Sequence, residues 1–173
     1  NGAKKNAIRK AVTTILDIDP YNEKWSLRLS EMDLESGDST AAAKHLQGWL
    51  RTHPDDKKSL NLLANITEKM PKHHNVYHKT LKSLLEIDPA NRSKTRYRLG
   101  IYYFQKENWP NAISQFKLIK KVYEKHAPFW FAYGASLKKS KSKVKLIKSP
   151  FRDYFAILKT KLMWGERYGT ING

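Results

Sequence analysis

A seven-residue phrase occurs three times along this chain at nearly even intervals, and no other feature constrains the fold as strongly. The phrase begins at Leu16 (LDIDPYN), at Leu50 (LRTHPDD) and at Leu85 (LEIDPAN), so the copies are 34 and then 35 residues apart. A fixed period of this length is the sequence signature of solenoids and helical arrays. The phrase also contains turn-forming residues, because proline cannot continue a helix and Asp or Asn favours a turn. We therefore expect it to separate one structural unit from the next.

The residues before each proline form amphipathic stripes. Apolar side chains recur there at i, i+4, i+7 and i+8, the spacing of one helix face. The stripes are Ile8, Val12, Ile15 and Leu16; Ala42, Leu46, Trp49 and Leu50; and Tyr77, Leu81, Leu84 and Leu85. Further helices are predicted over Trp25–Glu35, Ser59–Lys69 and Arg96–Lys106, and a last one from Pro110 through Ala112, Phe116 and Ile119. No segment alternates as a strand would, so the sequence predicts an all-α chain built from helical hairpins.

One stretch matches a known repeat closely. The segment YRLGIYYFQKENWPNAISQF places Leu99, Gly100, Tyr103, Ala112 and Phe116 as in the tetratricopeptide repeat, which this chain resembles. These are packing residues: Gly and Ala let the two helices of a hairpin approach closely, and the larger side chains fill the space between hairpins. The resemblance implies a right-handed α-solenoid with a concave groove lined by the first helix of each hairpin.

The other units are degenerate copies of the repeat. The unit at 23–56 keeps Leu29, Gly37, Ala42 and Pro54, but has Ser30, Asp33 and Leu46 where the family usually has Gly, Tyr and Phe. We expect repeats over residues 1–138, with a partial unit at 1–22, units at 23–56, 57–92 and 93–126, and the start of a last unit at 127–138. Residues 139–173 are expected to form a basic linker and an amphipathic helix that caps the solenoid.

The chain is strongly basic. It has 33 Lys and Arg residues against 16 Asp and Glu, a formal net charge of +17. Such an excess favours polyanionic partners such as nucleic acid, anionic lipid, glycan or an acidic protein surface. The absence of cysteine excludes disulfides, thiol catalysis and thiolate metal sites. No targeting signal is recognisable, so the location stays open, with the cytoplasm or the cytoplasmic face of a membrane favoured.

The resemblance also indicates which residues face the groove. Counted from residues 23, 57, 93 and 127, the second, fifth, ninth and twelfth places of each unit typically do so. The candidate binding residues are Lys24, Lys58, Asn61, Asn65, Lys94, Tyr97, Arg98, Phe104 and Phe131. Lysines supply positive charge, asparagines supply amide hydrogen bonds and aromatic rings supply stacking surfaces, which together suit an anionic ligand with some apolar surface. The alternative is that a lysine at a helix start is only a solvated surface residue.

Part of a carboxylate clamp is recognisable among these residues. Some tetratricopeptide proteins hold the terminal carboxylate of a peptide with Lys, Asn and Arg side chains, and Asn65, Lys94 and Arg98 resemble part of that set. Leu27 and Glu31, however, stand where a Lys and an Asn would be needed. The sequence therefore argues against a clamp of the chaperone type.

The basic tail carries much of the excess charge. Its candidate binding residues are Lys138, Lys139, Lys141, Lys143, Lys145, Lys148 and Arg152. Beyond the linker, Phe151, Tyr154, Phe155, Leu158 and Leu162 lie on one side of a predicted helix. Three interpretations stay open: the helix caps the last hairpin, lies on an anionic membrane, or binds a nucleic-acid backbone.

Catalytic constellations are not recognisable. We find no glycine-rich phosphate loop, no nucleophile elbow and no pair of acids in an apolar pocket. His74 and His78 have the i, i+4 spacing of a chelating pair, with His73 adjacent, but no carboxylate or Cys completes a metal site. We interpret them as surface histidines and expect no metal and no cofactor.

The sequence therefore predicts a non-catalytic protein-interaction scaffold whose basic groove and tail bind an acidic protein or peptide. One alternative is an accessory domain of a larger enzyme, for example a bacterial glycan-polymerising or glycan-exporting system, that holds an anionic glycan or a membrane surface. The other is an RNA-binding helical repeat. It ranks third because the base-reading codes of helical repeats use two or three residues per repeat, and no such pattern recurs here. The oligomeric state is not predicted.

Overall fold

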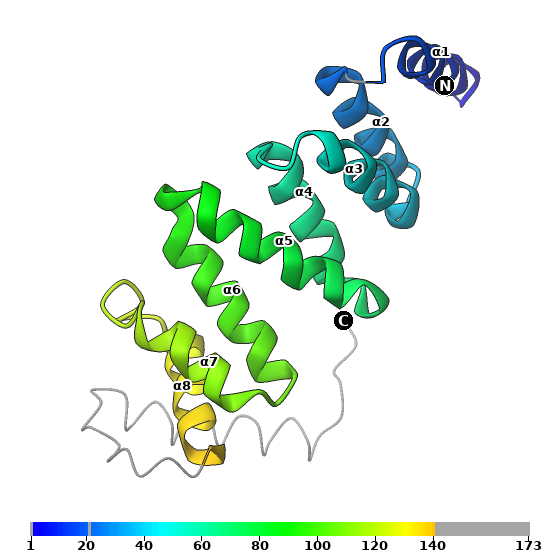
Figure 1. Cartoon of the computed structure of the whole chain (residues 1–173). Coiled ribbons are helices and arrows are strands. Elements are labelled where there is room, and N and C mark those ends of the chain that lie inside the picture. The colour runs from blue at the N-terminus through cyan, green and yellow to red at the C-terminus, as the bar shows by residue number, and fades with distance from the viewer. Residues whose placement is uncertain (1, 21, 141–173) are drawn as a thin grey trace, which may run out of the picture. The chain divides into compact units, whose positions relative to one another are not determined.

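The computed structural model describes residues 2–20 and 22–140, which are helical with connecting turns and contain no strand (Figure 1). The elements are α1 (Gly2–Ile18), α2 (Glu23–Glu35), α3 (Ser39–Thr52), α4 (Lys57–Glu68), the 3-10 turn η1 (Pro71–His73), α5 (His74–Ile87), the 3-10 turn η2 (Pro89–Asn91), α6 (Arg92–Gln105), α7 (Trp109–Lys117) and α8 (Ala127–Lys139). The predicted all-α fold of helical hairpins is confirmed. The predicted C-terminal capping helix lies outside the described residues.

The repeated phrase ends one helix and caps the next. Asn22, the last residue of the first phrase, accepts a backbone N–H of the first turn of α2 at 3.3 Å. Asp56, the last residue of the second phrase, accepts a first-turn N–H of α4 at 3.0 Å. In the third phrase, Asn91 Nδ2 donates to Asp88 Oδ2 at 2.9 Å and holds the turn before α6. Because Asn and Asp are good N-caps, α2 and α4 each begin two residues before the start predicted from the apolar pattern.

The chain divides into two compact units, residues 1–95 and the residues from Arg96 onward. In the first unit each helix packs on the next, from α1 through α5. Two apolar clusters contribute to its core: Ala42, Ala43, Leu46, Leu63 and Ile66 in one, and Val12, Leu29 and Met32 in the other. The first cluster draws its residues from α3 and α4, and the second from α1 and α2, so each hairpin is held to its neighbour by side chains of both.

A buried carboxylate joins the first three helices. The side chain of Asp33, in α2, has no exposed surface. Arg9 of α1 forms an ion pair with Asp33 Oδ1, and Nδ1 of His45, in α3, lies 2.7 Å from Asp33 Oδ2. Asp33 stands where the repeat usually has Tyr, so this departure from the family pattern replaces ring packing with a charged contact.

The core of the second unit is built around an aromatic ring. Phe116 of α7 is fully buried, and its cluster comprises Ala112, Phe116, Ile119, Phe129 and Ala132. The backbone of α6 approaches this ring at Gly100, where an added Cβ would lie 2.3 Å from the Phe116 ring. Glycine is therefore required sterically at this position, as the repeat pattern predicted.

The helix predicted through Ile119 is shorter than expected. α7 ends at Lys117, and residues 118–125 form a series of turns. Ile119 is still buried, and its carbonyl oxygen accepts the N–H of Tyr123 at 3.1 Å. The predicted helix end was wrong because an inward-facing side chain at helical spacing does not require a continuous helix.

Replacing Asp56 with Ala should lower the free energy of unfolding by about 1–2 kcal/mol near pH 7, because α4 loses its N-cap. Burial raises the pKa of the Asp56 carboxyl, but its interactions with Ser59 and the hydrogen bonds that it accepts from the Trp49 indole N–H and the Lys58 backbone N–H outweigh this effect. The pKa of Asp56 therefore lies below its ordinary value of 3.8. A carboxyl with a lowered folded-state pKa stabilises the fold above its unfolded-state pKa, and this stabilisation is lost as the pH falls through the folded-state pKa.

The measurement is urea unfolding of wild type and Asp56→Ala at several pH values from neutral to strongly acidic. We expect the difference between the two proteins to shrink as the pH falls below the unfolded-state pKa of Asp56. The control is Asp55→Ala, which removes an exposed neighbouring carboxylate that caps no helix. An equal difference at every pH would contradict the contribution assigned to the Asp56 charge.

Candidate binding surfaces

The first unit carries an open pocket on its first-helix side. Its volume is about 860 Å³, within the range of ligand-binding clefts. The lining residues come from the turn before α2, from α2 and from the start of α4: Asp19, Asn22, Glu23, Lys24, Trp25, Leu27, Arg28, Glu31 and Lys58. Two of the candidate groove residues, Lys24 and Lys58, line this pocket. Leu27 and Glu31, which occupy groove places in the repeat pattern, line it as well.

The pocket contains charges of both signs, and one cation is already paired. Arg28 lies 3.2 Å from carboxylate oxygens of both Glu31 and Glu35. The hydrogen bond to Glu31 and the negative charge of Glu35 raise the pKa of the Arg28 guanidinium. Arg28 is therefore already paired with acids on the exposed face of α2, and it is a poor candidate for binding an external anion.

Lys24 and Lys58 are held more loosely. Lys24 Nζ lies 5.3 Å from the centre of the Trp25 ring, a cation–π contact. Lys58 Nζ lies 3.9 Å from Glu23 Oε1, and both side chains are mostly exposed. An exposed ion pair at this distance contributes at most about 1 kcal/mol. Both ammonium groups can therefore turn toward an incoming carboxylate at little cost.

The other first-unit candidates, Asn61, Asn65 and Lys94, do not line this pocket. Asn61 donates its amide N–H to the carbonyl oxygen of Lys57 at 2.8 Å, one turn earlier in α4. Asn65 and Lys94 are exposed. Their part in a common groove remains a prediction.

In the second unit the predicted stacking residues are themselves packed. The Tyr97 ring stacks on Tyr123, with centroids 4.8 Å apart, and meets His126 edge-on at 5.3 Å. Burial, followed by the neighbouring Tyr123 hydroxyl, raises the pKa of Tyr97. Tyr97 is therefore largely committed to the hairpin core rather than to a ligand.

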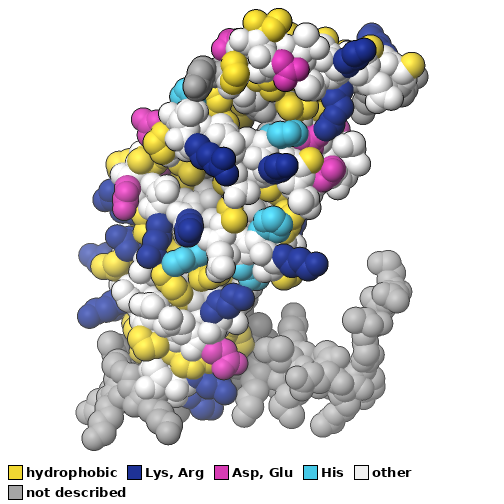
Figure 2. Space-filling view, turned by 45° about the vertical axis from the view of Figure 1, so that its right-hand side comes forward, with side chains coloured by type: hydrophobic (Ala, Val, Ile, Leu, Met, Phe, Trp, Pro, Cys, Tyr) yellow, Lys and Arg dark blue, Asp and Glu magenta, His cyan; other side chains and the backbone are white. Residues whose placement is uncertain are grey.

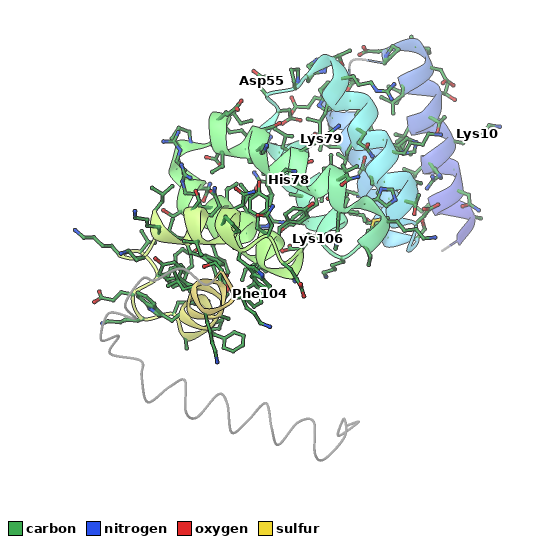
Figure 3. The ribbon with its side chains drawn as sticks, turned by 60° about the horizontal axis from the view of Figure 1, so that its bottom comes forward. Lys10, Asp55, His78, Lys79, Phe104 and Lys106 are labelled. Carbon is green, nitrogen blue, oxygen red and sulfur yellow. The ribbon has the colours of Figure 1, made fainter. Side chains whose placement is uncertain are left out.

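Phe104 is a better candidate for a surface ring. It lies beside α8 (Figure 3), 6.4 Å from the Phe131 ring centre and 5.6 Å from Trp109, in edge-to-face contacts. Phe104 and Phe131 are half-buried, so each ring keeps part of its surface exposed, and Arg98 is half-buried as well. The two rings form an apolar patch to which α6 and α8 both contribute.

The excess charge is concentrated outside the pocket. Residues 96–140 contain nine basic residues, Arg96, Arg98, Lys106, Lys117, Lys120, Lys121, Lys125, Lys138 and Lys139, but only two acids, Glu107 and Glu124. Figure 2 shows a face of the protein on which Lys and Arg side chains clearly outnumber Asp and Glu. Lys138 and Lys139 are exposed at the end of α8, whereas Lys141, Lys143, Lys145, Lys148 and Arg152 lie outside the described residues.

The histidines are less exposed than the sequence suggested. His73, His74 and His78 are each half-buried, and burial together with the Lys82 charge lowers the pKa of His78. Within residues 2–20 and 22–140, no group of three or more His, Cys, Asp or Glu side chains is arranged to hold a metal ion. Among the same residues, no helix has the length and apolarity that crossing a membrane requires.

Solved structures of MamA, a protein of the tetratricopeptide-like class, are similar to this chain. One has a TM-score of 0.65 at 13% identity and covers 99% of this chain and 90% of its own. MamA AMB-1 has a TM-score of 0.67 at 16% identity, covering 98% of this chain and 87% of its own. The fold is tetratricopeptide-like. At these identities the likeness concerns the fold alone; no family model and no curated protein matches the sequence.

In this tetratricopeptide-like fold the hairpins are α2–α3, α4–α5 and α6–α7, followed by α8. All nine candidate groove residues lie on α2, α4, α6 or α8, the first helices of their units. The sequence did not single out Trp25, although it forms part of the pocket. The sequence does contain a signal for Trp25, because an aromatic residue directly after a groove lysine can place its ring beneath the ammonium group.

Proposed function

We propose that this chain is a non-catalytic interaction module made of degenerate tetratricopeptide repeats, and that it binds an acidic segment of a partner protein. The segment docks on the first-helix side of the first unit, in the pocket that ends at Lys58. The observation that carries the proposal is the pair of loosely held lysines beside Trp25 and Leu27 in an 860 Å³ pocket. Trp25 and Leu27 supply apolar contact among charged side chains, a combination that peptide-binding sites use.

The charges of the pocket define the partner more closely. Asp19 and Glu23 line the pocket together with its lysines, and incoming carboxylates must displace the weak ion pair that Lys58 makes with Glu23. Charge alone therefore gives little net affinity, and the apolar contact with Trp25 and Leu27 must supply the rest. We infer a segment in which acidic residues alternate with at least one large apolar side chain. The packed hairpins keep the surface preorganised, which limits the entropy lost on binding.

The test is a charge reversal with a matched control. Lys24→Glu/Lys58→Glu should weaken binding of a fluorescent acidic peptide that contains Leu by about tenfold or more, because two favourable charges become repulsive. The control, Lys44→Glu/Lys79→Glu, makes the same change of net charge on α3 and α5 with exposed lysines that do not line the pocket (Lys79 is labelled in Figure 3). Fluorescence anisotropy at low and moderate salt measures both variants.

A second variant separates the apolar contact from the charges. Trp25→Ala should weaken the Leu-containing peptide but leave a purely acidic peptide of equal charge nearly unaffected. Equal losses in the pocket and control variants would reduce the effect to general electrostatics and contradict a defined site. Tighter binding to an acidic polysaccharide or to single-stranded RNA than to any peptide would favour one of the two alternative functions instead.

A further inference from the structure

The turn between α7 and α8 lacks the repeated phrase that separates the preceding units. The repeat period places a fourth copy of the phrase at residues 119–125, where the sequence is IKKVYEK. At the position of Asp88 in the third copy this segment has Val122, and at the position of Pro89 it has Tyr123. Lysines and an apolar residue stand in place of the turn-forming residues of the other copies. The surface of this turn therefore differs from that of the other junctions.

The residues of this turn separate into an inward and an outward set. Ile119 is 2% exposed in the core of the second unit, and the Tyr123 ring stacks on Phe129 with centroids 5.6 Å apart. Leu118 and Val122, by contrast, are 63% and 68% exposed. Their truncation would remove little buried surface, so the packing of the hairpin does not explain why they are apolar.

The turn is also firmly attached to α8. The carbonyl oxygen of Glu124 accepts the indole N–H of Trp130 at 2.8 Å. His126 caps α8, since its Nδ1 accepts the N–H of Phe129 at 3.2 Å. Leu118 and Val122 are therefore presented outward by an ordered turn, which lies at one end of the α7–α8 hairpin (Figure 1).

The charges close to these two side chains in the sequence are mostly positive. Four lysines accompany a single acid, Glu124, between residues 117 and 125: Lys117, Lys120, Lys121 and Lys125. Three of these lysines are exposed, and Lys120 is half-buried. An exposed aliphatic pair that lysines flank in the sequence matches an anionic surface that has apolar material directly beneath its charges.

We propose that the α7–α8 turn is a docking site for an anionic lipid bilayer, with Leu118 and Val122 inserted at the headgroup boundary and the lysines on the lipid phosphates and carboxylates. A bilayer is favoured over a protein because Leu118 and Val122 are mostly exposed on a surface turn. Residues that anchor protein partners sit in pockets that exclude water, whereas fluid lipid closes around an exposed apolar side chain. Juxtaposed lysines add attraction to anionic headgroups. This site is separate from the peptide pocket of the first unit.

The first experiment uses the complete chain and vesicles of phosphatidylcholine with phosphatidylserine. Leu118→Ser/Val122→Ser leaves every charge in place, including those of the basic tail, and should lower vesicle affinity about tenfold or more in co-sedimentation. The control, Ile18→Ser, removes an 81% exposed aliphatic side chain from α1 and should leave vesicle affinity unchanged. Vesicles of phosphatidylcholine alone should bind weakly in every case, because the lysines then have no anionic headgroups to contact.

A second measurement reports insertion directly. The chain has no cysteine, so a polarity-sensitive fluorophore on Val122→Cys labels one position only. Its emission should shift to the blue on anionic vesicles and be quenched by lipid-attached quenchers, while the same fluorophore on Lys79→Cys of α5 should show neither effect. The proposal is overturned if the complete chain does not bind these vesicles, or if it binds them without a shift at position 122. Binding that survives Leu118→Ser/Val122→Ser but is lost with Lys141, Lys143 and Lys145 replaced by Glu would equally overturn it.

Discussion

Gly100→Ala will lower the free energy of unfolding by about 1–3 kcal/mol, although alanine is the better helix former by roughly 1 kcal/mol. A Cβ at this position of α6 would lie 2.3, 2.7 and 2.8 Å from three ring carbons of Phe116. The ring cannot easily move away, because Phe116 is fully buried and packs edge-to-face against Phe129, with centroids 5.4 Å apart. Overpacking of the core therefore outweighs the gain in helix propensity.

The control for this prediction is a second glycine within a helix. Gly48 of α3 is exposed, and an added Cβ there would meet no atom within 4 Å. Gly48→Ala should therefore raise the free energy of unfolding by up to about 1 kcal/mol. Urea unfolding of both variants gives the comparison, and Gly100→Ala/Phe116→Leu should recover part of the loss. If both Gly→Ala variants were more stable than wild type, the close approach of α6 to Phe116 would be contradicted.

The fold was predictable because its determinants are local and repeated. The Asp-Pro-x-Asn phrase combines a helix stop with a helix cap, and Asn22 and Asp56 act as the caps that this chemistry requires. The pairing of Gly100 with Phe116 was predictable for the same reason, since a small and a large residue at fixed spacing mark a close helix contact. The exact end of α7 was not predictable, because the burial of Ile119 does not depend on continued helical hydrogen bonding.

The candidate site was predictable only in part. The repeat period selected Lys24 and Lys58, which line the same pocket, without any information on their neighbours. Which cation is already paired depends on side-chain geometry: Arg28 reaches Glu31 and Glu35 along α2. The aromatic residue Tyr97 was selected as a stacking surface, but its ring is used by the hairpin core. The position of a residue in the repeat therefore identified the helix face on which it lies. Only the structure shows whether its side chain is already used by contacts within the protein.

The distribution of charge bears on both proposals. Taken whole, the chain has a net charge of +17, which suggests a uniformly basic surface. The pocket of the first unit nevertheless balances Lys24, Arg28 and Lys58 against an equal number of acids, Asp19, Glu23 and Glu31. Residues 96–140, by contrast, contain nine Lys and Arg residues and only two acids. Under the two proposals, apolar contact selects a partner peptide in the first unit, whereas the second unit supplies the attraction to a polyanionic surface.

Asp33→Ala will lower the free energy of unfolding by about 2–3 kcal/mol, because Arg9 loses its ion-pair partner and His45 loses a buried hydrogen-bond partner. Asp33 is fully buried, while the side chains of Arg9 and His45 are 39% and 38% exposed. The remaining cation can therefore turn toward water, and the loss stays below the 3–5 kcal/mol or so expected when a charge is left unpaired inside a protein. Because Arg9 belongs to α1 and His45 to α3, the variant should also loosen α1 against α2.

The matched control lies on the same helix. Glu31 is also paired with an arginine, Arg28, but its side chain is 54% exposed. Glu31→Ala should change the free energy of unfolding by less than about 0.5 kcal/mol, since exposed ion pairs are screened by water. Hydrogen exchange adds a local readout, because Asp33→Ala should speed exchange of the α1 amides more than those of α5. Equal effects of Asp33→Ala and Glu31→Ala would mean that the buried contact adds no stability beyond that of a surface ion pair, and that the replacement of tyrosine at this place in the repeat has another cause.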